Sequence, residues 1–80
     1  MQNILLVDGY NMIGAWKELR PLRDENFEDA RDRLVELMAE YKAVKGWRVI
    51  IVFDAHLVPG TEQLYIQHDV EVIITSKNET

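Results

Sequence analysis

Three short apolar runs, each next to an aspartate, constrain the fold of this chain most strongly. They cover residues 3–7, 47–53 and 70–75; the first two end directly before Asp8 and Asp54, and the third follows Asp69. Short runs rich in valine and isoleucine are typical of strands buried inside a parallel sheet. The third run alternates most at its start, so we expect it nearest to an edge. The pattern predicts an α/β fold.

A long helix is predicted between the first two runs. Apolar residues recur at spacings of three and four positions from Phe27 to Val44, as on the buried face of a helix. Asn26 is a suitable N-terminal cap, and Gly46 is a suitable stop. We therefore expect one helix of about five turns, packed on the sheet.

The other connections are shorter. Residues 11–19 predict a short helix that Pro21 interrupts, and residues 55–60 predict a loop because they end in Pro-Gly. Strands joined by such connections form parallel sheets with right-handed crossovers. One long helix covers only one face, whereas parallel sheets are normally covered on both. We expect residues 1–80 to be the incomplete N-terminal portion of one three-layer, Rossmann-like domain. Further chain, or a partner such as a second copy in a homodimer, would complete it.

Composition excludes several classes of protein. The chain has no cysteine, so it has no disulfide framework and no zinc–thiolate cluster. We find neither a basic leader with an apolar core nor an apolar stretch of about 20 residues. We therefore expect a cytoplasmic protein that does not enter a membrane. The net charge of −5 does not exclude a protein that acts on nucleic acid, because carboxylates that hold metal ions also raise the number of acidic residues.

Asp8 and Asp54 are the leading candidates for chemistry. In open α/β sheets, ligands bind beyond the carboxyl ends of the strands, and both residues follow a predicted strand there. Side by side, two carboxylates suit Mg²⁺ or Mn²⁺, which can activate water next to a phosphate. Asn11 follows Asp8 by three residues and would face the same site. The alternative is that each aspartate only caps a turn and that Asn11 only caps a helix.

Weaker candidates follow the first aspartate. Lys17, Arg20 and Arg23 could contact RNA phosphates, although a solvated loop explains them equally simply. Tyr10 and Trp16 could stack on bases, or they could be core contacts.

Four strings in the sequence resemble a known family. They are ILLVDGYNMIGAW at residues 4–16, EDARDRL at 28–34, VFDAH at 52–56 and NET at 78–80. Together they resemble the YacP-like members of the NYN ribonuclease domains, a branch of the PIN-like nucleases. Their order and spacing match the family over the whole chain, which is far more specific than the D-G-Y-N string alone.

The resemblance implies a sheet with helices on both faces and a cluster of acids that binds a divalent metal. It also implies endonucleolytic cleavage of RNA and, for YacP-like members, of messenger RNA on the ribosome. Asp8 matches the first metal-binding acid, Asn11 the motif asparagine, and Asp54 the acid that ends the second strand. In the family, residues equivalent to Glu79 and Thr80 continue into an Ala-Asp pair whose aspartate joins the cluster. The 80 residues lack that acid.

Other functional classes fit less well. A receiver-type signalling domain would use Asp54 as its phosphoacceptor. However, receiver domains have a further strand before that position, and they have a second acid at the position where this chain has Gly9. A haloacid-dehalogenase-type phosphatase would have an acid at Tyr10. A non-catalytic RNA-binding fragment is the remaining alternative.

Overall fold

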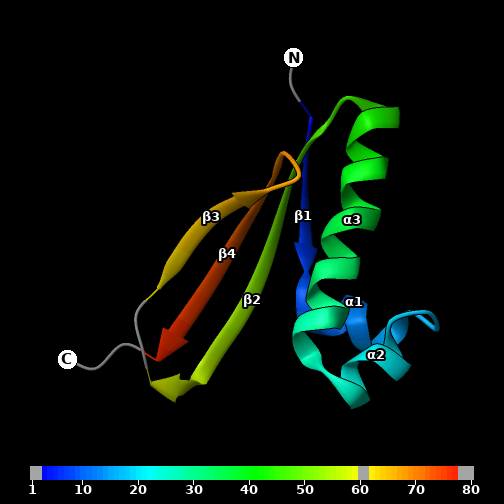
Figure 1. Cartoon of the computed structure of the whole chain (residues 1–80). Helices are drawn as coiled ribbons and strands as arrows, with labels where there is room; N and C mark the ends of the chain where they lie inside the picture. Colours follow the sequence, from blue (N-terminus) through cyan, green and yellow to red (C-terminus); the bar gives the residue numbers. More distant parts are fainter. Residues whose placement is uncertain (1–2, 60–61, 78–80) are drawn as a thin grey trace.

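The computed structural model describes residues 3–59 and 62–77. Its elements in chain order are β1 (Ile4–Asp8), α1 (Gly9–Ala15), α2 (Arg20–Glu25), α3 (Phe27–Lys45), β2 (Arg48–Pro59), β3 (Gln63–Gln67) and β4 (Val70–Lys77). The strands form one sheet in the order β1-β2-β4-β3 (Figure 1). β1, β2 and β4 are parallel, and β3 is antiparallel to β4. The predicted α/β class is therefore confirmed, whereas the NET string at residues 78–80 lies outside the described residues.

All three helices lie on one face of the sheet (Figure 1). Side chains alternate along a strand, and those that face the helices, such as Val7, Ile51 and Val72, are buried. On the opposite face, Leu6 is 69% exposed and Leu64 is 70% exposed. The molecule is a slab only 18 Å thick in its shortest dimension. Within residues 3–59 and 62–77 the fold thus has two layers, and the third layer expected for this fold class is not formed by them.

The long helix forms where the sequence predicts it. The Asn26 side chain accepts a hydrogen bond from the Glu28 backbone N–H at 2.9 Å and so caps α3. Gly46 ends the helix with a φ of 71°, a left-handed conformation that suits glycine. The buried side of α3 carries Ala30, Leu34, Val35 and Met38. These residues attach the helix to the sheet and form much of the core.

The short helices differ from the prediction. α1 begins at Gly9 rather than at residue 11, directly after β1. Pro21 does not interrupt a helix but stands in the first turn of α2. A proline is tolerated there because the first backbone N–H groups of a helix need no partner within it.

The third predicted strand, β4, was expected nearest to an edge, but it lies inside the sheet and β1 is at an edge. β3 pairs with β4 and covers it, and a two-residue turn of His68 and Asp69 joins them. Both residues have positive φ, 50° and 68°, as type I′ turns require. That turn usually carries asparagine or glycine, which explains why the hairpin was not predicted. β2 also continues through residues 55–59, where a loop was expected, with an irregular register between Ala55 and Pro59.

Arg48 and Glu71 form an ion pair on the uncovered face of the sheet. Arg48 on β2 donates two hydrogen bonds to the Glu71 carboxylate on β4, through Nε at 2.5 Å and a terminal nitrogen at 2.7 Å. These bonds hold the pKa of Glu71 below its ordinary value, against the smaller opposing effect of desolvation. The pair joins β2 to β4 near their amino-terminal ends. Homodimer formation through the uncovered face or the outer edge of β1 stays a prediction.

No helix in the described part of the chain is long and apolar enough to cross a membrane.

Candidate functional site

Asp8 ends β1, and Asp54 lies on the neighbouring parallel strand β2. The prediction that Asp54 ends the second strand is wrong, because β2 continues to Pro59. Asp8 pairs with Val52, so Asp54 lies two residues farther along β2. Because side chains alternate along a strand, Val52 and Asp54 point to the same face. Both aspartates line one hollow of about 350 Å³ together with Leu6, Val7 and Val52. The structure therefore brings the two predicted acids together.

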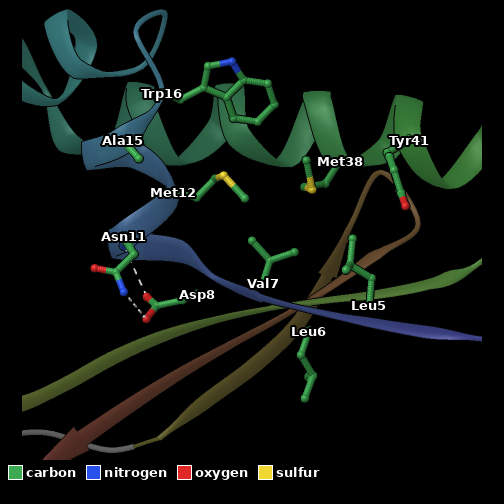
Figure 2. Close-up of a pocket in the computed structure, with 10 residues that line it drawn as sticks. All are labelled: Leu5, Leu6, Val7, Asp8, Asn11, Met12, Ala15, Trp16, Met38 and Tyr41. Atoms are coloured by element: carbon green, nitrogen blue, oxygen red, sulfur yellow. Dashed lines mark hydrogen bonds between the residues drawn. The ribbon is translucent and has the colours of Figure 1, made fainter.

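Asp8 is held in place by the helix that follows it. One carboxylate oxygen accepts the Asn11 backbone N–H at 3.2 Å, and the other accepts the Asn11 side-chain amide at 2.8 Å (Figure 2). Asp8 is thus the N-terminal cap of α1, and Asn11 fixes the orientation of its carboxylate. Each oxygen can accept more than one hydrogen bond, so the capped carboxylate keeps acceptor capacity for a cation. Capping and a functional role are compatible for both residues.

Asp54 is oriented by β4, the strand that pairs with β2 on the side away from β1. The Thr75 hydroxyl on β4 donates a hydrogen bond of 2.9 Å to one Asp54 carboxylate oxygen. Asp54 and Thr75 are register partners on the parallel strands β2 and β4. Sequence reasoning did not include Thr75. Its signal was present, since it is a hydroxyl residue at the end of the third apolar run.

Gly9 lets α1 pack close to the sheet. A Cβ atom at Gly9 would lie 2.3 Å from Cε1 of Phe53, far closer than real contacts allow. The φ of Gly9 is not positive; among the described glycines, only Gly46 has a positive φ. Gly9 is needed for space rather than for conformation. It brings the capped Asp8 next to β2.

The three basic residues lie away from the acids. Lys17 lies in the turn after α1, and Arg20 and Arg23 lie on α2. All three are exposed, and none lines the hollow that contains Asp8 and Asp54. Arg23 forms an ion pair of 3.4 Å with Asp24. The structure does not bring these cations to the acids, and their contact with RNA phosphates stays a prediction.

A second hollow of about 610 Å³ lies at the outer edge of β1, beneath α1 and α3 (Figure 2). Met12, Trp16, Met38 and Tyr41 give it a largely apolar lining, and Asp8 and Asn11 stand at one end. Leu6 points to the opposite side of β1 in this view. Asp8 thus borders a hollow on each side of its strand. The polar side chains that line the two hollows include those of Asp8, Asn11 and Asp54.

The donor set fits a magnesium-type ion. Mg²⁺ in proteins is usually held by one or two carboxylates, with water and substrate phosphates completing its shell. Asp8 and Asp54 supply two exposed carboxylates that are already oriented by hydrogen bonds. No group of three or more acids or histidines suited to a metal occurs among the side chains that the structure describes. The residues therefore fit a two-carboxylate site.

Comparison with known proteins identifies close relatives. Residues 5–80 match the model of the YacP-like NYN domain family. The protein YacP of Bacillus subtilis (strain 168) is 60% identical over 78 residues, which are 98% of this chain and 46% of YacP. The crystal structure of Rae1 (YacP) from Bacillus subtilis has a TM-score of 0.74 at 57% identity and covers 100% of this chain. A point variant of Rae1 gives a TM-score of 0.76 at 54% identity, over 99% of this chain. The match covers only 45% and 44% of those two chains, so this chain spans less than half the length of its relatives.

Proposed function

Because the chain belongs to the YacP-like NYN domain family, which points to a nuclease, we propose that it forms the N-terminal part of a metal-dependent endoribonuclease domain. The observation that carries the proposal is the pair of oriented carboxylates at the carboxyl end of β1, where Asp8 ends β1 and Asp54 lies on the adjacent parallel strand β2. Open α/β sheets bind their ligands beyond the carboxyl ends of their strands, and the end of β1 is such a position.

Each residue of the site has a distinct role in this proposal. Asp8 is the principal ligand of a Mg²⁺ or Mn²⁺ ion, and Asp54 is the second ligand. Asn11 acts through Asp8, because its backbone and side-chain N–H groups fix the carboxylate from two directions. Thr75 does the same for Asp54 through its hydroxyl. When bound, such an ion supplies an activated water and neutralises charge on the phosphodiester that is cut.

The substrate that we propose is RNA, and specifically messenger RNA on the ribosome in the cytoplasm. The support for RNA is family membership together with a site whose carboxylates suit phosphate chemistry through a cation. The support for ribosomal action is the resemblance of residues 4–16 to YacP-like proteins. An acidic chain repels a polyanion, and a bound cation would reduce this repulsion at the site.

Removal of the metal tests the proposal. The protein, in the longest form that its gene encodes, is incubated with an RNA labelled at its 5′ end, and the products are sized. We expect internal cuts in Mg²⁺ or Mn²⁺ and none in EDTA, with activity restored by excess metal. Cutting that continues in EDTA after metal removal would contradict a metal-dependent site, and products shortened only from one end would contradict an endonuclease.

A non-catalytic RNA-binding role is the second candidate. It is favoured by the absence of a third acid beside Asp8 and Asp54 among residues whose side chains are described. The same incubation separates the two functions. RNA that is retarded on a native gel but stays intact in both metals would favour binding alone.

A further inference from the structure

Tyr10 is an exposed aromatic residue inside the motif that carries the proposed site. It stands on the first turn of α1, between Asp8 and Asn11. Its side chain is 40% exposed. The other aromatic residues, all of which the structure describes, are buried or half-buried, so Tyr10 is the most exposed of them.

The ring of Tyr10 is held in a fixed position by two other rings. Its centroid lies 5.4 Å from that of Phe27, tilted by 34°, and 5.4 Å from that of Phe53, edge-on at 79°. Phe53 is only 1% exposed and belongs to the core. Aromatic contacts of this geometry stabilise the ring beyond simple burial. Tyr10 is therefore a rigid platform rather than a mobile surface side chain.

The platform lies at the carboxyl end of β1, as Asp8 does. Tyr10 follows Asp8 by two residues, and its ring contacts Phe53, the residue before Asp54. Phe53 faces the helices, whereas Asp54 faces the opposite side, because side chains alternate along β2. A strand of RNA that crosses the carboxyl end of β1 would thus meet the acids on one side and the Tyr10 ring on the other.

The other aromatic residues are less suited to this role. Trp16 is half-buried against the core and lines the apolar hollow at β1. Tyr41 and Trp47 pack edge-on against each other at the other end of α3, with centroids 6.0 Å apart. The sequence offered Tyr10 and Trp16 as equal candidates for base stacking, and the structure favours Tyr10.

We propose that Tyr10 stacks on a base of single-stranded RNA next to the phosphodiester held at Asp8 and Asp54. The inference deepens the proposed function and rests on it. Stacking on an aromatic ring tolerates every base, because each base has a π-face. Tyr10 would therefore position the nucleotide beside the cut without imposing a sequence.

The test measures RNA binding and stacking separately from cleavage. All variants carry Asp8→Asn to prevent cutting, and a single-stranded RNA with 2-aminopurine at successive positions reports stacking by fluorescence quenching. We expect Tyr10→Leu to weaken binding by about tenfold and to abolish the quench at saturating protein, while Tyr10→Phe and Tyr10→Trp keep both. Tyr65→Leu, on β3 and outside the site, is the matched control and is expected to change neither.

A replacement variant and two outcomes keep the role of Tyr10 separate from the proposed function. If Tyr10→Leu does not fold, Tyr10→Met replaces it, because a flexible thioether can maintain contact with Phe27 and Phe53 without a flat ring. An unchanged affinity and quench in a folded, non-aromatic variant would overturn the role of Tyr10 while leaving the proposed function intact. Failure of the protein without any substitution to bind RNA, in EDTA or in Mg²⁺, would instead count against the proposed function itself.

Discussion

Replacing Asp8 with asparagine is expected to reduce RNA cleavage by roughly 100-fold or more, since even partners that only orient a metal ligand cost 10- to 100-fold when removed. The substitution removes the negative charge that would hold a cation. It keeps an oxygen that can still accept the Asn11 backbone N–H, and asparagine caps helices as well as aspartate does. The fold should therefore survive. Cleavage rates and thermal unfolding of the same preparation check both expectations.

Asp32→Asn is the matched control for this experiment. Asp32 is an exposed aspartate on α3, and its carboxylate accepts a long hydrogen bond of 3.4 Å from the Gln67 side-chain amide. Its replacement removes the same charge at a position outside the site, and cleavage is expected to stay within about twofold of the parent, because exposed pairs contribute little. Full activity in a folded Asp8→Asn protein would exclude Asp8 as the principal metal ligand.

Replacing Gly9 with alanine is expected to destabilise the protein by about 2–4 kcal/mol, at or above the usual cost of overpacking a core. The added Cβ would lie 2.3 Å from Cε1 and 2.6 Å from Cδ1 of Phe53. That ring cannot move aside easily, because it is buried and contacts the rings of Tyr10 and Phe27. α1 must therefore shift away from β2. Urea unfolding followed by circular dichroism measures the change.

Gly14 provides the internal control for Gly9. Both glycines lie on α1, but a Cβ at Gly14 would meet only the Arg23 guanidinium, at 3.4 Å. Gly14→Ala is expected to stabilise the protein by about 0.5–1 kcal/mol, because alanine favours a helix over glycine. Phe53→Leu should reduce the cost of Gly9→Ala, since it removes the clashing ring atoms. Equal effects at both glycines, or additive effects of Gly9→Ala and Phe53→Leu, would show that the ring contact is not the cause.

Much of the fold follows from local patterns in the sequence. The helix from Phe27 to Lys45 was predictable because its apolar period, its Asn26 cap and its Gly46 stop agree with one another. The parallel strands β1 and β2 were predictable because their apolar runs are interrupted by neither glycine nor proline. The hairpin of β3 and β4 was not, because His68 and Asp69 adopt positive φ without the residues that usually signal it.

The candidate site was predictable in its acids but not in its supporting contacts. Asp8 and Asp54 each follow an apolar run, and the parallel register of β1 and β2 brings them together. That β2 continues past Asp54 was not predictable, because the Pro-Gly pair at residues 59–60 indicates a loop. The contact of Thr75 with Asp54 depends on the register of β4 against β2, which local sequence does not encode. The steric reason for Gly9 depends on a ring 44 positions away, at Phe53. Long-range packing of this kind requires the three-dimensional structure.

Binding of Mn²⁺ tests most directly whether Asp8 and Asp54 form one metal site. Electron paramagnetic resonance of free Mn²⁺ gives the number of ions bound and their affinity in the parent protein, in Asp8→Asn, in Asp54→Asn and in the control Asp32→Asn. The predicted result is a bound ion in the parent, weakened by about tenfold or more in each site variant and unchanged in the control. No binding by the parent, or equal binding by all four proteins, would contradict the account.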